Sequence, residues 1–323
     1  MAQHEVNGRC YPMPDFIIGG AMKCATTTLH EILATHPRIF IPPGELKFFS
    51  LDDFMQQPEF AFPTPDGTWN KYSLNEQDQH YLRWYADFFS DSPEAAILGE
   101  DTPTYLASEL APDRISEMAP NTKLIFLLRE PVARTYSHYW HWVRSGRTPH
   151  HFEQAIRQQA YPLLQRSFYF EQLQRYHSLL KAEQIRVVLF EQFIAEPQKI
   201  VSELCDFLGV TPLTLQIEKQ SNPGSIPRFH SLQLMHNWMT FPYIGYKHLP
   251  FLPGNGSLRR PLYIRTINRI HNAINPMRHG KPRPMRSGTR EFLTDYLVER
   301  NRGLSKLLGF SLVEYWGDAY AAV

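Results

Sequence analysis

A polar stretch near the N-terminus carries the residue types that bind a phosphate. Residues 16–18 form an apolar run typical of a buried strand, and Gly19 and Gly20 permit a sharp turn before a helix that begins near Thr26. Backbone N–H groups at a helix start are unpaired, and the helix dipole favours an anion beside them. Lys23 and the hydroxyls of threonines 26–28 would add hydrogen bonds. The stretch therefore predicts a phosphate-binding turn.

This turn departs from the P-loop of nucleoside triphosphatases. Lys23 lies in the middle of the turn, and Cys24 and Ala25 stand where that P-loop has its Gly-Lys pair. An ordinary strand-to-helix turn with a solvated lysine, and with Cys24 as a small apolar filler, is the alternative that this stretch alone leaves open.

Further polar residues follow other predicted strands. We predict strands at residues 38–41, 96–99, 123–128 and 185–190, separated by helical patterns. Strands that alternate with helices imply a parallel sheet in a three-layer α/β fold, where ligands bind at the carboxyl ends of the strands. Each polar residue alone could equally be an exposed surface residue, but the shared position predicts one site. The residues after the strands are Glu45 and Lys47, then a loop from Glu100 through Thr102 to Tyr105, then Arg129.

The start of the helix after residue 128 is a second candidate phosphate site. Arg129, Arg134 and Ser137 follow the most apolar strand of the chain, and Pro131 can open a helix there. The eight residues from Arg129 to Ser137 cover about two helical turns, so their side chains can lie along one face. The pattern predicts a grip on a second phosphate, away from the first.

Composition limits the classes of partner. The 323 residues carry a formal net charge of +1, so bulk charge gives no case for nucleic acid or for an anionic membrane surface. Three cysteines at unrelated spacings favour neither a disulfide framework nor a zinc site, and no Asp/His cluster has metal-ligand spacing. The polar N-terminus and the lack of a long apolar run predict a cytoplasmic protein without a membrane span. The sequence leaves the oligomeric state open.

Other segments are assigned to packing or left open. Aromatic residues at helical spacing within 81–89 are interpreted as core, with a bound aromatic ligand as the less favoured alternative. Residues 52–75 predict a long irregular surface insertion. Residues 220–286, rich in proline and arginine, predict either a lid or substrate-facing subregion, or a loosely packed helical extension. A last helix is expected over 289–308, and the whole chain, 1–323, is expected to be one domain.

Three separately placed motifs resemble those of one family. They are Gly20-x-x-Lys23-x-x-Thr26-Thr27, then Glu45-x-Lys47-Phe48-Phe49, then Arg129-x-Pro131-x-x-Arg134-x-Tyr136-Ser137. Together they resemble the sulfotransferases that use 3′-phosphoadenosine-5′-phosphosulfate (PAPS), in particular the heparan-sulfate and bacterial branch. The resemblance covers residues 15–218 and a further match at 283–316. It implies a P-loop-like three-layer α/β/α fold with a central parallel sheet of about five strands.

The resemblance also implies roles for individual residues. Glu45 matches the catalytic base, and Lys47 occupies a position where many relatives carry histidine or another polar residue. The loop of Glu100, Thr102 and Tyr105 resembles the acceptor side. The implied donor-binding residues are Lys23, Cys24, Ala25, Thr26 and Thr27 for the 5′-phosphosulfate, Arg129 and Ser137 for the 3′-phosphate, and, less specifically, Tyr169, Lys281 and Arg283 for the adenosine and 3′-phosphate.

Sulfuryl transfer suits these residue types. It is an in-line displacement, to which a protein contributes positioning and charge stabilisation. Lys23 would neutralise charge on the leaving phosphate, and Glu45 would accept the proton of an attacking hydroxyl or amine. The acceptor could be a carbohydrate, a lipid or a small molecule. The acidic side chain of Asp101, in the same loop, would repel a polyanionic acceptor.

Two alternatives to a sulfotransferase remain at this point. The first is a nucleotide-dependent kinase on a related P-loop fold, which would need magnesium and a carboxylate that the sequence does not place. The second is a non-catalytic nucleotide-binding protein that retains the phosphate turn.

Overall fold

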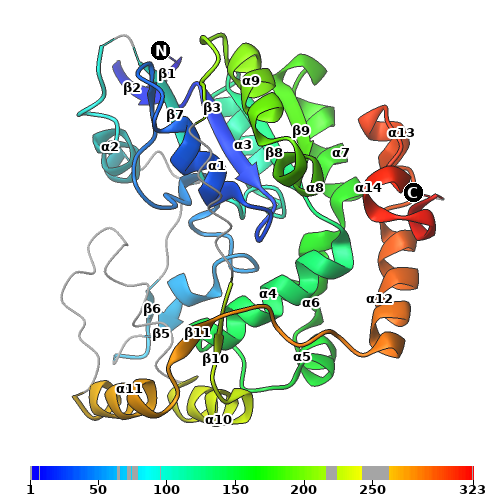
Figure 1. Cartoon of the computed structure of the whole chain (residues 1–323). Helices are drawn as coiled ribbons and strands as arrows, with labels where there is room; N and C mark the ends of the chain where they lie inside the picture. The colour runs from blue at the N-terminus through cyan, green and yellow to red at the C-terminus, as the bar shows by residue number, and fades with distance from the viewer. Residues whose placement is uncertain are drawn as a thin grey trace.

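The central element of the protein is a parallel β-sheet with helices on both faces (Figure 1). The structure is a computed structural model and describes all residues except 1, 7, 64–65, 71–73, 75–78, 95, 216–223, 242–261 and 322. The sheet has five strands in the order β4-β7-β3-β8-β9, and every neighbouring pair is parallel. These strands are β3 (Phe16–Gly20), β4 (Ile39–Phe40), β7 (Ile97–Asp101), β8 (Lys123–Leu128) and β9 (Ile185–Leu189). The three-layer fold with five parallel strands is thereby confirmed.

The described helices connect these strands and extend the protein beyond the sheet (Figure 1). They are α1 (Thr26–Leu33), α2 (Gln79–Asp87), α3 (Ala111–Met118), α4 (Pro131–Ser145), α5 (Phe152–Gln158), α6 (Ala160–Leu164), α7 (Tyr169–Leu179), α8 (Phe190–Ala195), α9 (Pro197–Leu208), α10 (His230–Thr240), α11 (Leu262–Ile274), α12 (Ser287–Arg300), α13 (Leu304–Leu308) and α14 (Val313–Trp316), with a short 3-10 helix η1 (Phe48–Ser50).

The inner strands form because their residues are apolar on both faces. All five residues of β3 are buried, as are the last five of β8, which suits a strand covered by helices on both sides. Gly99 in β7 pairs with Phe16 in β3, and a Cβ at Gly99 would lie 2.3 Å from the Phe16 ring. This glycine is therefore required for the close packing of the two strands, which brings the ends of β3 and β7 together.

The aromatic stripe at residues 81–89 belongs to the core, as interpreted from its spacing. Tyr85 of α2 is fully buried, and its ring stacks on Phe48 with centroids 4.2 Å apart. Phe49 meets Tyr85 edge-on at 5.8 Å. The stripe thus fixes η1, the short helix that follows Glu45 and Lys47.

Small antiparallel sheets lie outside the central one. The N-terminal residues pair as β1 (Ala2–Val6) with β2 (Arg9–Met13), a hairpin that the polar sequence did not predict. The other two pairs are β5 (Phe62–Pro63) with β6 (Trp69–Asn70), and β10 (Ser225–Pro227) with β11 (Met277–His279).

Two predictions about irregular and helical segments were wrong. The segment after residue 52 is not simply a surface insertion: Gln56 and Gln57 are buried, and the Gln56 side chain donates to the carbonyl of Ala107 at 3.2 Å. The last helix is broken into α12 and α13, because Gly303 takes a left-handed conformation, φ +91°, between them. No described helix is long and apolar enough to cross a membrane.

Candidate active site

The turn between β3 and α1 is tight and leaves the start of α1 without a side-chain cap. Gly20, at φ +152°, ends the strand, and a Cβ there would lie 2.6 Å from Cβ of Leu106. Lys23 and Ala25 both take left-handed conformations, φ +71° and +67°, which side chains rarely adopt. Ala25 is the N-cap of α1 and has no side chain to accept a hydrogen bond, so the first backbone N–H groups of α1 lack a side-chain partner. Such groups fit a phosphate oxygen.

The side chains of the turn divide between core and surface. Cys24 is fully buried among apolar residues, and burial raises the pKa of its thiol to about 12. It is the apolar filler that the sequence left as an alternative, so it can offer a ligand only its backbone. Thr26 is buried and Thr27 is exposed, so Thr27 is the threonine hydroxyl of this pair with direct access to solvent.

Positive charge gathers around Lys23. Burial lowers the pKa of Lys23 below its ordinary value, and the neighbouring guanidinium groups of Arg144 and Arg129 lower it further, while Glu45 acts in the opposite direction. Arg129 Nη1 donates to the carbonyl oxygen of Lys23 at 3.4 Å, and its guanidinium lies over the Phe190 ring, 4.5 Å from the centroid. Nothing in the sequence spacing singled out Arg144, which lies at the far end of α4.

Glu45 and Lys47 form an ion pair near this turn. Lys47 Nζ lies 3.5 Å from Glu45 Oε2, and the two side chains are 17% and 39% exposed. Lys47 is held in a left-handed conformation, φ +58°, at the N-terminus of η1. The exposed carboxylate of Glu45 can therefore meet a substrate while Lys47 and Lys23 supply positive charge beside it.

The residues at the end of β7 and in the loop after it face inward. Glu100, Thr102 and Tyr105 are fully buried, and both hydroxyls donate to Glu100 Oε1, at 2.8 and 2.6 Å. Tyr85 donates to Glu100 Oε2 at 2.5 Å. In turn, Thr102 accepts from the backbone N–H of Lys47 at 3.1 Å, and Tyr105 accepts from that of Phe49 at 3.2 Å. In this structure the three predicted acceptor-side residues hold the segment that carries Glu45 and Lys47.

Asp101 also turns out to be buried, which overturns its expected repulsion of a polyanion. Its Oδ2 lies 3.4 Å from Nδ1 of His30. Burial raises the pKa of Asp101 to about 6, and the neighbouring Glu45 adds to the shift. A buried carboxylate facing a histidine presents little negative charge to an acceptor.

The second candidate phosphate site lies where β8 meets α4. Arg129 and the half-buried Ser137, the two residues predicted to bind a second phosphate, belong to this region. Tyr169 is fully buried, and its hydroxyl donates to the carbonyl oxygen of Arg129 at 2.9 Å. This hydrogen bond fixes the backbone of Arg129. The hydroxyl of Tyr136 donates to the carbonyl of Arg283 at 2.7 Å, which brings the late segment with the exposed Arg283 and Lys281 against α4.

Arg134 does not share the outer face of α4 with Ser137, contrary to the prediction from spacing. Its guanidinium is fully buried, and Nε donates to Ser167 Oγ at 2.5 Å, while Nη2 donates to the carbonyl of Leu163. Burial lowers the pKa of Arg134. The side chain therefore ties α4 to the α6–α7 connection, and it does not reach a ligand.

Two further positions were not recognised as supports of the site. Arg166 is buried, and its Nε donates to Gln56 Oε1 at 3.0 Å, which ties the segment after η1 to the α6–α7 connection. Glu130 caps α4 by accepting from the N–H of Ala133 at 2.6 Å. A proline at the first helical position after an acidic residue was the signal available for this cap. Among the described residues no group of three His, Cys, Asp or Glu side chains could hold a metal ion.

Comparison with known proteins identifies the class. The sequence profile of the sulfotransferase family matches residues 14–214, well over half of the chain. The protein therefore belongs to the sulfotransferase family.

Individual relatives agree with this assignment. The human bifunctional heparan sulfate N-deacetylase/N-sulfotransferase 2 is 28% identical over 219 residues, which cover 63% of this chain and 23% of that protein. The human heparan sulfate glucosamine 3-O-sulfotransferase 3B1 is 27% identical over 206 residues, covering 61% of this chain and 46% of that protein. A crystal structure of a sulfotransferase from Alicyclobacillus acidocaldarius is 28% identical, with a TM-score of 0.51, and covers 74% of this chain and 95% of that one. The chain thus spans less than half of the length of these two curated relatives.

Proposed function

We propose that this protein transfers a sulfuryl group from PAPS to a hydroxyl or amine of an acceptor and releases 3′-phosphoadenosine-5′-phosphate (PAP). One observation carries the proposal: the uncapped turn with the part-buried Lys23 lies beside Glu45, whose carboxylate is exposed and close enough to influence the pKa of Lys23. A lysine for the leaving phosphate and a carboxylate for the attacking proton are the two groups that this displacement needs.

Each residue contributes through position and charge. The backbone N–H groups of the turn and Lys23 bind the 5′-phosphosulfate, and Thr27 adds a hydroxyl. Glu45 accepts the proton of the acceptor as its oxygen or nitrogen forms the new bond to sulfur. Lys23 neutralises the charge that grows on the phosphate oxygen as its bond to sulfur breaks. Lys47 Nζ, 3.5 Å from Glu45 Oε2, orients that carboxylate before the reaction.

The second phosphate of the donor is assigned to the α4 site. Arg129 and Ser137 bind the 3′-phosphate, and Arg283 and Lys281 approach it from the segment held by Tyr136. Tyr169 acts indirectly, because its hydroxyl is bonded to the backbone of Arg129. A donor with phosphates at the 3′ and 5′ positions of its ribose matches basic residues at both the β3–α1 turn and the start of α4 better than a nucleoside triphosphate does.

The acceptor class is proposed from the relatives and from the site. The names of two relatives specify heparan sulfate and its glucosamine, an acceptor with both hydroxyl and amine groups. Asp101 is buried beside His30 and is not exposed to an acceptor, which weakens the argument from its charge against such a polymer. A carbohydrate hydroxyl or amine is therefore the acceptor we test first, with lipids and small molecules next.

The test is an activity assay with PAPS and an acceptor panel, read by mass spectrometry for the gain of one sulfate group. We expect Lys23→Ala and Glu45→Gln to lower turnover on the order of a hundredfold or more, because each removes a charge that matters in the transition state. Lys306→Ala on α13 and Glu31→Gln on α1, both exposed, serve as matched controls. Unchanged turnover in both site variants would contradict these roles.

Calorimetry separates the alternatives. A sulfotransferase binds PAP without magnesium, whereas a kinase binds ATP with magnesium more tightly than PAP. A non-catalytic nucleotide-binding protein would bind PAP yet sulfate no acceptor of the panel.

A further inference from the structure

The helices α10 and α11 contact each other through polar side chains. The rings of His236 and His271 stack with centroids 3.9 Å apart. The buried His271 bonds through Nε2 to Gln233 Oε1 at 3.0 Å, and His236 bonds through Nε2 to Asn268 Oδ1 at 2.9 Å. A surface helix normally turns its polar side chains to water and its apolar ones inward. Here polar groups occupy the contact between the two helices.

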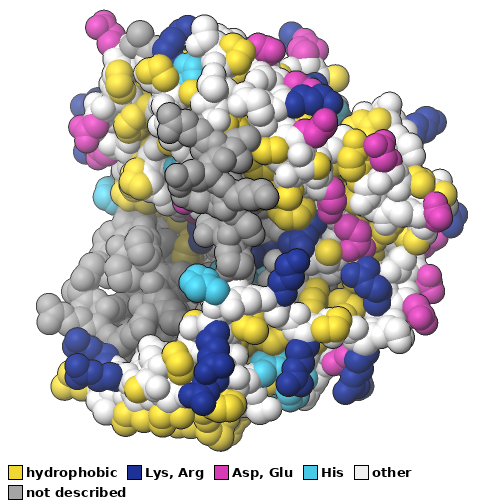
Figure 2. Space-filling model, viewed as in Figure 1, with side chains coloured by type: hydrophobic (Ala, Val, Ile, Leu, Met, Phe, Trp, Pro, Cys, Tyr) yellow, Lys and Arg dark blue, Asp and Glu magenta, His cyan; other side chains and the backbone are white. Residues whose placement is uncertain are grey.

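The outward faces of the two helices are correspondingly apolar. Leu262, Ile270 and Ile274 of α11 are 76%, 55% and 55% exposed, and their spacing of eight and four residues places them on one side of the helix. On α10, Trp238 and Met235 are 71% and 54% exposed. We call these five residues the α10–α11 face. Figure 2 shows hydrophobic side chains along the lower edge of the molecule, where Figure 1 places both helices.

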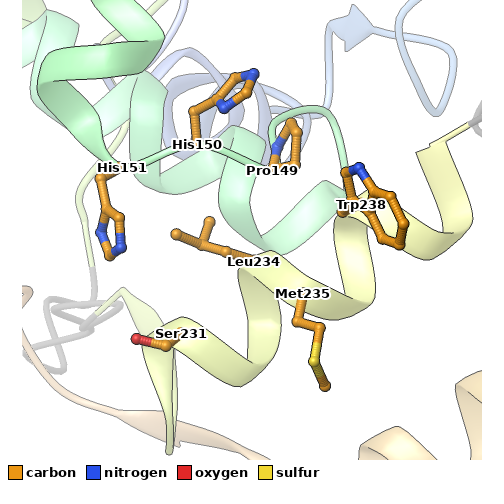
Figure 3. Close-up of a pocket in the computed structure, with 7 residues that line it drawn as sticks. All are labelled: Pro149, His150, His151, Ser231, Leu234, Met235 and Trp238. Atoms are coloured by element: carbon orange, nitrogen blue, oxygen red, sulfur yellow. The ribbon is translucent and has the colours of Figure 1, made fainter.

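A recess lies at the α10 side of this face. It has a volume of about 240 Å³, and Figure 3 shows Trp238, Met235 and Leu234 from α10 along it, with Pro149 opposite. Most of its lining is apolar, so the face offers an indentation as well as a surface to an apolar group.

The segment of sequence that carries the two helices has charge of one sign. Between residues 219 and 290 the sequence has twelve Lys and Arg residues and no Asp or Glu, although the whole chain is nearly neutral. Arg265 and Arg269 are exposed and lie beside the apolar side chains of α11. No carboxylate of the described residues lies within ion-pair distance of Arg265, Arg269 or Arg278. The chain as a whole has a net charge of +1, yet this segment of its sequence is strongly basic.

We propose that the α10–α11 face docks on the surface of an anionic lipid bilayer. An apolar face flanked by arginines matches the two layers of such a surface, since the apolar side chains can enter the acyl boundary while the arginines meet lipid phosphates. A polyanionic glycan would use the arginines but leave the apolar face in water. A second copy of the chain would cover the apolar face but bring two basic regions together.

Vesicle sedimentation tests the proposal. The purified protein should sediment with vesicles that contain phosphatidylglycerol and not with pure phosphatidylcholine vesicles, and high salt should release it. The pair Arg265→Ser with Arg269→Ser should weaken binding about tenfold or more. The pair Ile270→Ser with Ile274→Ser should weaken it about as much, because both side chains would no longer insert.

Matched controls are exposed residues elsewhere: Arg83→Ser on α2 and Ile194→Ser on α8, which is 58% exposed, should bind like the wild type. Circular dichroism melting shows whether each variant remains folded. The proposal fails if the wild type ignores anionic vesicles, if it binds neutral vesicles equally, or if the isoleucine pair binds as the wild type does. It also fails if sedimentation velocity shows that the Ile270→Ser, Ile274→Ser variant has changed from a dimer to a monomer while its binding to vesicles is unchanged. These outcomes are independent of whether the protein transfers sulfate.

Discussion

Lys23 shows at the scale of one residue how the site departs from an ordinary surface turn. A solvated lysine keeps its ordinary pKa, whereas burial and two nearby arginines lower the pKa of Lys23. The positive charge of a lysine among other cations is stabilised when an anion binds, because the anion offsets the repulsion between the lysine and those cations. The residue is thus suited to a ligand that brings several negative charges.

Ala25 supports a prediction at the same scale. Its left-handed backbone, φ +67°, places the Cβ in a strained position that glycine would relieve. Ala34, the C-cap of the same helix, has the ordinary right-handed conformation, φ −64°. We expect Ala34→Gly to destabilise the protein by about 0.5–1 kcal/mol, and Ala25→Gly to be neutral or stabilising. Urea unfolding of both variants measures the difference, and an equal loss in the two would show that Ala25 carries no strain.

At the scale of elements, one buried carboxylate joins β7, α2 and η1. Glu100 accepts hydrogen bonds from Tyr85, Thr102 and Tyr105, and two of these hydroxyls accept backbone N–H groups of the Lys47–Phe49 segment. We infer that Glu100 is a positioning residue for the Glu45–Lys47 pair. The sequence places Glu100, Thr102 and Tyr105 near the site, but it does not tell which of them face the substrate.

The same carboxylate predicts a pH dependence of stability. Burial raises the pKa of Glu100 to about 7, above the ordinary value that it regains on unfolding. The folded state then binds more protons than the unfolded state between those two values, so Glu100 lowers stability progressively as pH rises toward about 7. Glu100→Gln should remove this part of the pH dependence and flatten the curve of unfolding free energy against pH.

Urea unfolding at several pH values from about 4 to about 8 measures this effect. Glu109→Gln is the control, because Glu109 is an exposed carboxylate near the same loop. If the Glu100→Gln curve runs parallel to the wild-type curve, Glu100 does not titrate in this range.

For the whole molecule, the sheet was predictable and its surroundings were only partly so. β3 and β8 are apolar on both faces, which marks an inner strand of a parallel sheet, and the residues that follow such strands necessarily gather at one edge. The inward turn of Arg134 depends on partners at Ser167 and Leu163, about thirty positions away, and no local pattern reports it. The packing of α10 on α11 depends on polar contacts, which hydrophobic periodicity does not detect.

The proposed donor site unites parts of the chain that are far apart in sequence, which gives a last prediction. PAP should raise the melting temperature by several degrees at saturating concentration, because it binds only the folded state. Adenosine 5′-monophosphate lacks the 3′-phosphate and should raise it less. Arg283→Gln should remove part of the advantage of PAP over the monophosphate, since Tyr136 holds the Arg283 segment against α4 beside Ser137.

Arg286→Gln is the matched control in these melting experiments, because Arg286 is an exposed arginine three positions further along whose guanidinium lies 3.9 Å from Glu153 instead. Loss of the PAP advantage in Arg283→Gln but not in Arg286→Gln would assign the effect to one side chain and not to the basic region as a whole. Equal shifts by the two nucleotides in the wild type would contradict a separate 3′-phosphate site. Equal losses in the two variants would instead indicate a long-range effect of charge, which salt would suppress.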